Sequence, residues 1–141
     1  MATETVDFEK TLQELGLGEG WEWDKGSWWL TPAELIDVRA TAEHMRKLEA
    51  RFVAITAIEL PDKEIRLDYQ WDLDGKLLSF VAATCEHKIA TIADISPAAD
   101  WVERETHEYF AVEFIGRENT KPLMTRPGDA VGINLHKEVA Q

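Results

Sequence analysis

One carboxylate stands where a helix pattern expects an apolar side chain. Residues 97–110 have the periodicity of a helix, and at about 100° per residue Glu105 falls inside its apolar arc. That arc consists of Ala98, Trp101, Val102 and Tyr109. A carboxylate there is a raised-pKa general acid, a ligand or a structural anchor. The pattern favours a buried structural anchor, with Arg66, Arg104 and Arg126 as candidate cationic partners.

Two other residues of the same helix could also take part in catalysis or metal binding. Glu103 and His107 lie four residues apart, outside the apolar arc, and side chains at that spacing are neighbours on a helix. An alternative hypothesis is therefore a small stand-alone acid–base enzyme that uses Glu105, or Glu103, with His107. The pair could also bind a metal in principle, but the two-histidine spacing of a zinc helix is absent. We therefore predict no metal site.

Composition narrows the function classes. Fifteen Lys and Arg against 27 Asp and Glu give a net charge of −12, which repels phosphate backbones and disfavours nucleic-acid binding. One cysteine, Cys85, can form no intrachain disulfide and cannot hold an iron–sulfur cluster alone, so it is expected to end a strand as a small buried hydrophobe. The chain shows no signal-peptide start and no apolar run of membrane-spanning length. A soluble, cytoplasmic protein is predicted.

The elements around this helix predict an α+β domain between two flanking segments. Residues 1–20 are expected to form a short helix and a glycine-rich linker. The tryptophan-rich segment 21–30 suits one or two short strands, in which the tryptophans either pack in the core or form an exposed patch for a partner. A helix is predicted to begin at Thr31 as its cap and to run to about Arg51. Its apolar stripe consists of Leu35, Val38, Ala42, Met45 and Leu48.

Three strands are expected to follow. Residues 52–60 are apolar on both faces, which is typical of a central strand. Residues 65–73 alternate strictly, and Asp74-Gly75 is a hairpin turn leading into the strand 77–85. The predicted fold is a two-layer α+β domain over residues 21–115, with a mixed or mainly antiparallel sheet packed against helices.

In the segment 91–116, a short aspartate-containing stretch leads through Pro97 into a helix with Glu-Arg-Glu at its centre. This segment resembles the signature of the thirty-kilodalton (30 kDa) subunit of respiratory complex I, the NADH dehydrogenase. The signature and docking positions that the resemblance implies are Trp101, Glu103, Arg104, Glu105, Glu108, Tyr109, Phe110 and Phe114. The upstream helix and strands resemble the family more weakly. Ala111 stands where the family has glycine, and Arg117-Glu118 stands where it has His-Pro.

These departures and the short chain are more similar to the short homologue of this subunit in energy-converting, membrane-bound nickel–iron hydrogenases. The resemblance implies a non-catalytic subunit of the peripheral arm, on the inner face of the cell membrane and attached to it only through the complex. It implies docking to a hydrogenase-like large subunit, the homologue of the complex I 49 kDa subunit, and to a small iron–sulfur subunit. No cofactor is expected in this chain, whereas iron–sulfur clusters and Ni-Fe would lie in the partners.

The last segment, 116–141, is predicted to be an irregular docking tail outside the core. It has four basic and three acidic residues, in contrast to the acidic domain, and proline and glycine interrupt it. Its apolar residues are Leu123, Met124, Val131, Ile133 and Leu135. An ordinary chain terminus is the alternative.

Overall fold

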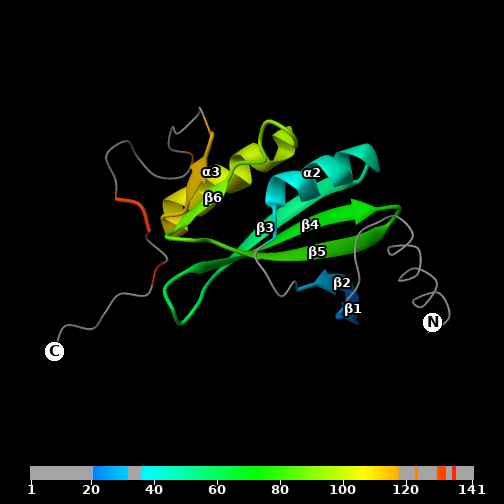
Figure 1. Ribbon diagram of the computed structural model, residues 1–141, viewed down its shortest axis with the longest axis horizontal. Coiled ribbons are helices and arrows are strands. Elements are labelled where there is room, and N and C mark those ends of the chain that lie inside the picture. The colour runs from blue at the N-terminus through cyan, green and yellow to red at the C-terminus, as the bar shows by residue number, and fades with distance from the viewer. Residues whose placement is uncertain (1–20, 32–35, 118–122, 124–129, 133–134, 136–141) are drawn as a thin grey trace.

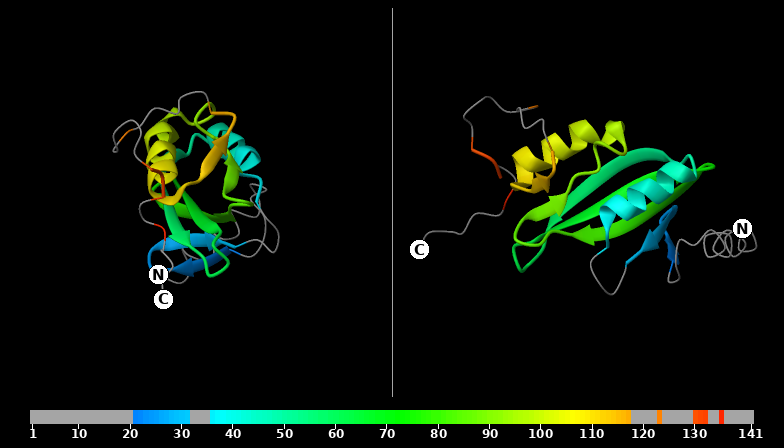
Figure 2. Two further views of the ribbon diagram at one scale, coloured as in Figure 1. Left: turned by 90° about the vertical axis from the view of Figure 1, so that its left-hand side faces the viewer. Right: turned by 45° about the horizontal axis from the view of Figure 1, so that its top comes forward.

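The structure is a computed structural model that describes residues 21–31, 36–117, 123, 130–132 and 135. The expected N-terminal helix and linker lie outside the described residues. Figure 1 shows a twisted sheet with both labelled helices on one of its sides, and Figure 2 shows the same layers from two other directions. The elements in chain order are β1 (Trp21–Asp24), β2 (Ser27–Leu30), α2 (Val38–Lys47), β3 (Arg51–Glu59), β4 (Ile65–Leu73), β5 (Lys76–Ala83), β6 (Lys88–Ala90), the 3₁₀ turn η1 (Pro97–Ala99), α3 (Asp100–Phe110) and β7 (Glu113–Ile115).

The five-stranded sheet has the order β1-β2-β5-β4-β3, and a separate two-stranded sheet pairs β6 with β7. Neighbours in the larger sheet are antiparallel except for β2 and β5, which run parallel. The β6–β7 pair is also parallel. The two-layer α+β fold with a mixed sheet is therefore confirmed.

The tryptophan-rich segment forms the hairpin of β1 and β2. Its tryptophans include buried and exposed ones, which are the two alternatives that the sequence left open. Trp21 and Trp28 are buried, and the Trp21 ring packs edge-on against Phe80 at 5.0 Å between centroids. The Trp23 ring contacts the Trp28 ring with 5.4 Å between their centroids, and Trp23 is 49% exposed. The hairpin therefore extends the core beyond β5, because strand pairing places two indoles on its inner face.

The helix α2 begins later than predicted. Asp37 is its cap: the carboxylate accepts hydrogen bonds from the backbone N–H groups of Arg39 and Ala40, each at 3.1 Å. A continuous helix from Thr31 to about Arg51 is wrong, because Ile36 and Asp37 are non-helical. Residues 32–35, which would form the first turn after a cap at Thr31, lie outside the described part. The predicted end near Arg51 is also wrong, since α2 ends at Lys47. The apolar stripe is confirmed at Val38, Ala42 and Met45, which are buried, and Leu48 packs against the core.

The strand β3 lies at the edge of the sheet and not at its centre. It contacts η1 and α3, which explains its inward apolar residues, whereas Val53 and Ile58 are 40% and 46% exposed. The prediction of a central strand is therefore wrong. It rested on apolar residues on both faces of the strand, and the sequence does not show whether an apolar face is covered by other elements or exposed to solvent. The central strand is β5.

The alternation of β4 places its apolar side chains in the core as predicted. Ile65, Leu67, Tyr69 and Trp71 are all at most 1% exposed, and Leu73 is 7% exposed. The next strand, β5, ends at Ala83, so Cys85 lies beyond it in a bridge to Lys88. Cys85 is exposed, which contradicts the expectation of a buried strand end. None of the described helices is long and apolar enough to cross a membrane.

Candidate functional site

The helix α3 is anchored through Glu103, which has no exposed surface. Its Oε1 accepts a hydrogen bond from the Thr91 hydroxyl at 2.5 Å and another from the Arg117 guanidinium at 3.0 Å. Its Oε2 accepts from the backbone N–H of Ile92 at 2.8 Å. One carboxylate therefore joins α3 to the segment after β6 and to the segment after β7.

Arg117 completes this anchor. Its side chain is 6% exposed and also pairs with Asp100 in the first turn of α3. Burial raises the pKa of Glu103, and the hydrogen bonds from Ile92, Thr91 and Arg117 oppose that rise. The cluster is a satisfied buried ion pair, and its polar atoms are occupied by the fold itself.

The sequence prediction for Glu105 is wrong, because Glu105 is exposed and the buried carboxylates of α3 are those of Glu103 and Glu108. The candidate partners Arg66 and Arg104 are engaged elsewhere, with Asp68 and Asp100, and Arg126 lies outside the described residues. The buried face of α3 contains Glu103 and Glu108, whose carboxylates accept hydrogen bonds from residues outside the helix. Hydrophobic periodicity therefore selected the wrong face of the helix.

The eight signature positions divide into three groups by exposure. Glu103, Glu108 and Phe114 are buried, and Arg104, Tyr109 and Phe110 are half-buried. Trp101, at 67% exposure, and Glu105 face outward. The helix therefore presents two signature side chains to solvent instead of to the core.

Glu108 connects α3 to the C-terminal segment. Its carboxylate accepts a hydrogen bond from the backbone N–H of Leu123, and its backbone carbonyl accepts from Gly132 N–H at 2.7 Å. Leu135 packs against the core cluster. These described positions of the segment 116–141 belong to the folded domain, as does Arg117, and the docking role of the segment stays a prediction.

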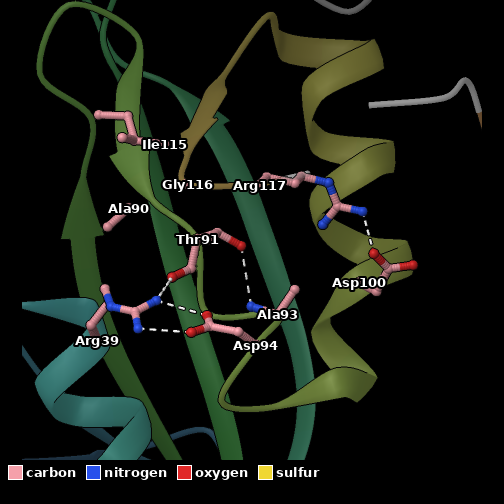
Figure 3. Close-up of a pocket in the computed structure, with 9 residues that line it drawn as sticks. All are labelled: Arg39, Ala90, Thr91, Ala93, Asp94, Asp100, Ile115, Gly116 and Arg117. Carbon is pink, nitrogen blue, oxygen red and sulfur yellow. Dashed lines mark hydrogen bonds and ion pairs between the residues drawn. The ribbon is translucent and has the colours of Figure 1, made fainter. Parts of the chain in front are cut away.

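An open cleft of about 710 Å³ lies between α2 and the beginning of α3 (Figure 3). On one side, the Arg39 guanidinium binds both carboxylate oxygens of Asp94 at 2.7 and 2.8 Å and donates to the Thr91 carbonyl at 2.8 Å. This pairing lowers the pKa of Asp94 below its ordinary value. On the other side lie Asp100 and Arg117, pointing toward each other. The cleft therefore holds paired charges.

The sequence suggested two pairs for acid–base catalysis, Glu105 with His107 and Glu103 with His107. Neither pair is arranged for catalysis in the structure. The Glu103 carboxylate is fully enclosed, so a substrate cannot reach it, and Glu105 lies on the surface. His107 Nδ1 lies 2.9 Å from the Val112 carbonyl, at the end of α3. Among the described residues, no group of three or more His, Cys, Asp or Glu side chains could hold a metal ion.

Sequence reasoning missed Arg39, Asp94, Thr91 and Arg117. Arg39 and Asp94 are separated by 55 residues, and no local pattern links them. Arg117 was noted as a departure from the family pattern, which was a usable signal, since a charged residue at an altered position often has a new partner.

The structure defines a small α+β domain in which a buried ion pair fixes the helix α3. The family model described as respiratory-chain NADH dehydrogenase, 30 Kd subunit, matches residues 29–141, so the chain belongs to that family. The C subunit of NADH-quinone oxidoreductase from Ruegeria sp. (strain TM1040) is 31% identical over 81 residues, covering 54% of this chain and 40% of that protein. The corresponding protein of Rhodopseudomonas palustris (strain BisB18) is 26% identical over 105 residues, covering 66% and 53%. The chain thus spans about half the length of these curated relatives or less.

Two solved structures share the fold. A chain of the membrane-bound sulfane sulfur reductase, an archaeal respiratory membrane complex, superposes with a TM-score of 0.63 at 23% identity, covering 83% of this chain and 72% of that chain. A trypsin-resistant fragment of Nqo5 superposes with a TM-score of 0.60 at 19% identity, covering 79% and 98%. The predicted family and fold are therefore confirmed.

Proposed function

We propose that this chain is a non-catalytic subunit of the peripheral arm of a complex I-like oxidoreductase or energy-converting hydrogenase. Its main support is membership of the 30 kDa subunit family together with the division of the signature helix into a buried anchor and an outward face. The enclosed Glu103 and the paired charges of the cleft suit a scaffold, since these charged groups are engaged in contacts within the fold.

The chain docks to a hydrogenase-type large subunit, the relative of the complex I 49 kDa subunit, and lies close to a small iron–sulfur subunit. Those partners hold the iron–sulfur clusters and any Ni-Fe centre, and this chain holds no cofactor. It works on the inner face of the cell membrane and is bound there only through the complex. Electron transfer coupled to ion translocation is the activity that it supports by holding the arm together.

The test is purification of the affinity-tagged full chain from membranes of its native host in a mild detergent. We expect a hydrogenase-type or quinone-reductase-type large subunit in about equal amount, and a loss of complex activity from membranes that lack this chain. A tagged chain that remains in the soluble fraction without any large subunit would contradict the proposal.

A further inference from the structure

The outward face of η1 and α3 consists of Ala98, Trp101 and Glu105. These positions recur at three and four residues, so they lie one above another on the helix. All three are exposed, and the Trp101 indole is 67% exposed. An exposed indole leaves a large apolar surface in contact with water, and burying that surface against a partner would be favourable. Tryptophan is also enriched at the centres of protein interfaces. The face is therefore a candidate contact with another protein.

The charge on this face is a single carboxylate. Within the described residues, no hydrogen bond or ion pair engages the Glu105 side chain. The adjacent Arg104 is turned away, with a side chain 15% exposed and 3.9 Å from Asp100, and Arg117 is held by Asp100 and Glu103. A carboxylate on a chain of net charge −12 repels phosphate and attracts a cation.

The four-residue spacing defines the chemistry of that cation. Side chains at this spacing on a helix have Cβ atoms about 5–6 Å apart. A planar guanidinium can lie on the Trp101 ring and hydrogen-bond to the Glu105 carboxylate at the same time, which a compact ammonium does less well.

A hollow of about 240 Å³ adjoins the face at Ala98. It lies between the end of α2 and η1, and its apolar lining is Ala50, Phe52, Ile95, Pro97 and Ala98, with Arg46 and Glu49 also lining it. An apolar side chain close to the arginine in the same partner segment would fit this hollow and exclude water from the ion pair.

We propose that the outward face binds an arginine-bearing segment of a partner subunit, with the guanidinium on Trp101 and Glu105 and a neighbouring apolar side chain in the hollow. This inference rests on the proposed function, because it assumes that the chain assembles with a large subunit. The inference adds to the proposed function the surface of this chain that makes the contact and the side chains that the partner contributes.

The experiment measures how much large subunit is retained by the tagged full chain, in complexes purified from the native host at increasing salt. Trp101→Ala and Glu105→Arg are expected to weaken retention by about tenfold or more, and Glu105→Gln by less. The matched controls are Trp23→Ala and Glu22→Arg on β1, which replace a tryptophan of 49% exposure and an exposed glutamate outside η1 and α3. The control variants should retain the wild-type amount.

Two further measurements separate the possible outcomes. Thermal unfolding of each isolated variant should match wild type, so that lost retention is not lost folding. A photo-reactive residue placed at Ala98 should cross-link a partner peptide that contains arginine. Wild-type retention by Trp101→Ala and Glu105→Arg, or a cross-linked peptide without arginine, overturns this inference and leaves the proposed function intact. A wild-type chain that retains no large subunit overturns both.

Discussion

Glu103 and Arg117 form an ion pair of 3.0 Å in which the two side chains are 0% and 6% exposed. The pair joins the middle of α3 to the segment that follows β7, and Thr91 and Ile92 complete the coordination of the carboxylate. Arg117 stands where the family has a different residue, yet it binds a residue of the family signature. The departure is therefore part of the structural core of this chain, and it explains why α3 can bury a carboxylate.

Glu103→Ala is expected to lower the free energy of unfolding by about 3–5 kcal/mol, because it leaves the Arg117 charge and the Ile92 N–H buried without this acceptor. Urea denaturation of the isolated chain measures this loss. Glu105→Ala is the matched control, because it removes an exposed glutamate from the same helix and should change the free energy by less than about 0.5 kcal/mol. Equal effects of the two substitutions would contradict the anchor role of Glu103.

Ala111→Gly is expected to stabilise the protein by about 1 kcal/mol. Ala111 ends α3 in the left-handed region, with φ of 55° and ψ of 35°, which a residue with a Cβ atom adopts at a cost and glycine adopts freely. The control is Ala40→Gly, at an exposed position inside α2, which should destabilise by about 1 kcal/mol. Calorimetric melting of both variants should give shifts of opposite sign, and a destabilised Ala111→Gly would show that the methyl group is needed for packing.

Asp37→Ala is expected to cost about 1 kcal/mol, since the backbone N–H groups of Arg39 and Ala40 lose the side-chain acceptor that caps α2. Thr31→Ala serves as the comparison, because Thr31 was the cap expected from the sequence. That variant should leave the helix content and the denaturation midpoint unchanged. The reverse ranking of the two variants would restore a helix start at Thr31.

Stability should fall in acid partly through Asp94. The Arg39 guanidinium holds the pKa of the Asp94 carboxyl below its ordinary value of 3.8 in the folded protein. A depressed folded pKa means that the unfolded chain binds the proton first, so this contribution is present above about pH 4 and is lost as the pH falls through the folded value. Carbon-13 NMR titration should show the depressed pKa directly, and Arg39→Gln should return it toward 3.8. An unshifted carboxyl in the wild-type chain would contradict the pair.

Removal of the residues after Pro127 should destabilise the domain by about 2 kcal/mol without unfolding it. The truncation deletes the hydrogen bond from Gly132 N–H to the Glu108 carbonyl and the half-buried Leu135 side chain. Urea denaturation measures the difference, and Leu135→Ala in the full chain should account for about half of it. A truncated chain as stable as wild type would show that the described contacts of this segment contribute nothing to the fold.

The sequence by itself determined the alternating strand β4, the Asp74-Gly75 turn and the extent of the signature helix. These features depend on the spacing of neighbouring residues along the chain, so they can be deduced without knowing the fold. The family came from the resemblance of one contiguous segment, and the family model confirms it. The tertiary structure decided which face of α3 is buried. The buried face contains Glu103, whose burial depends on Thr91, Ile92 and Arg117, and distant hydrogen-bond partners of this kind leave no periodicity in the sequence. The edge position of β3 was decided in the same way, because strand order follows from pairing between distant segments and not from the residues of one strand.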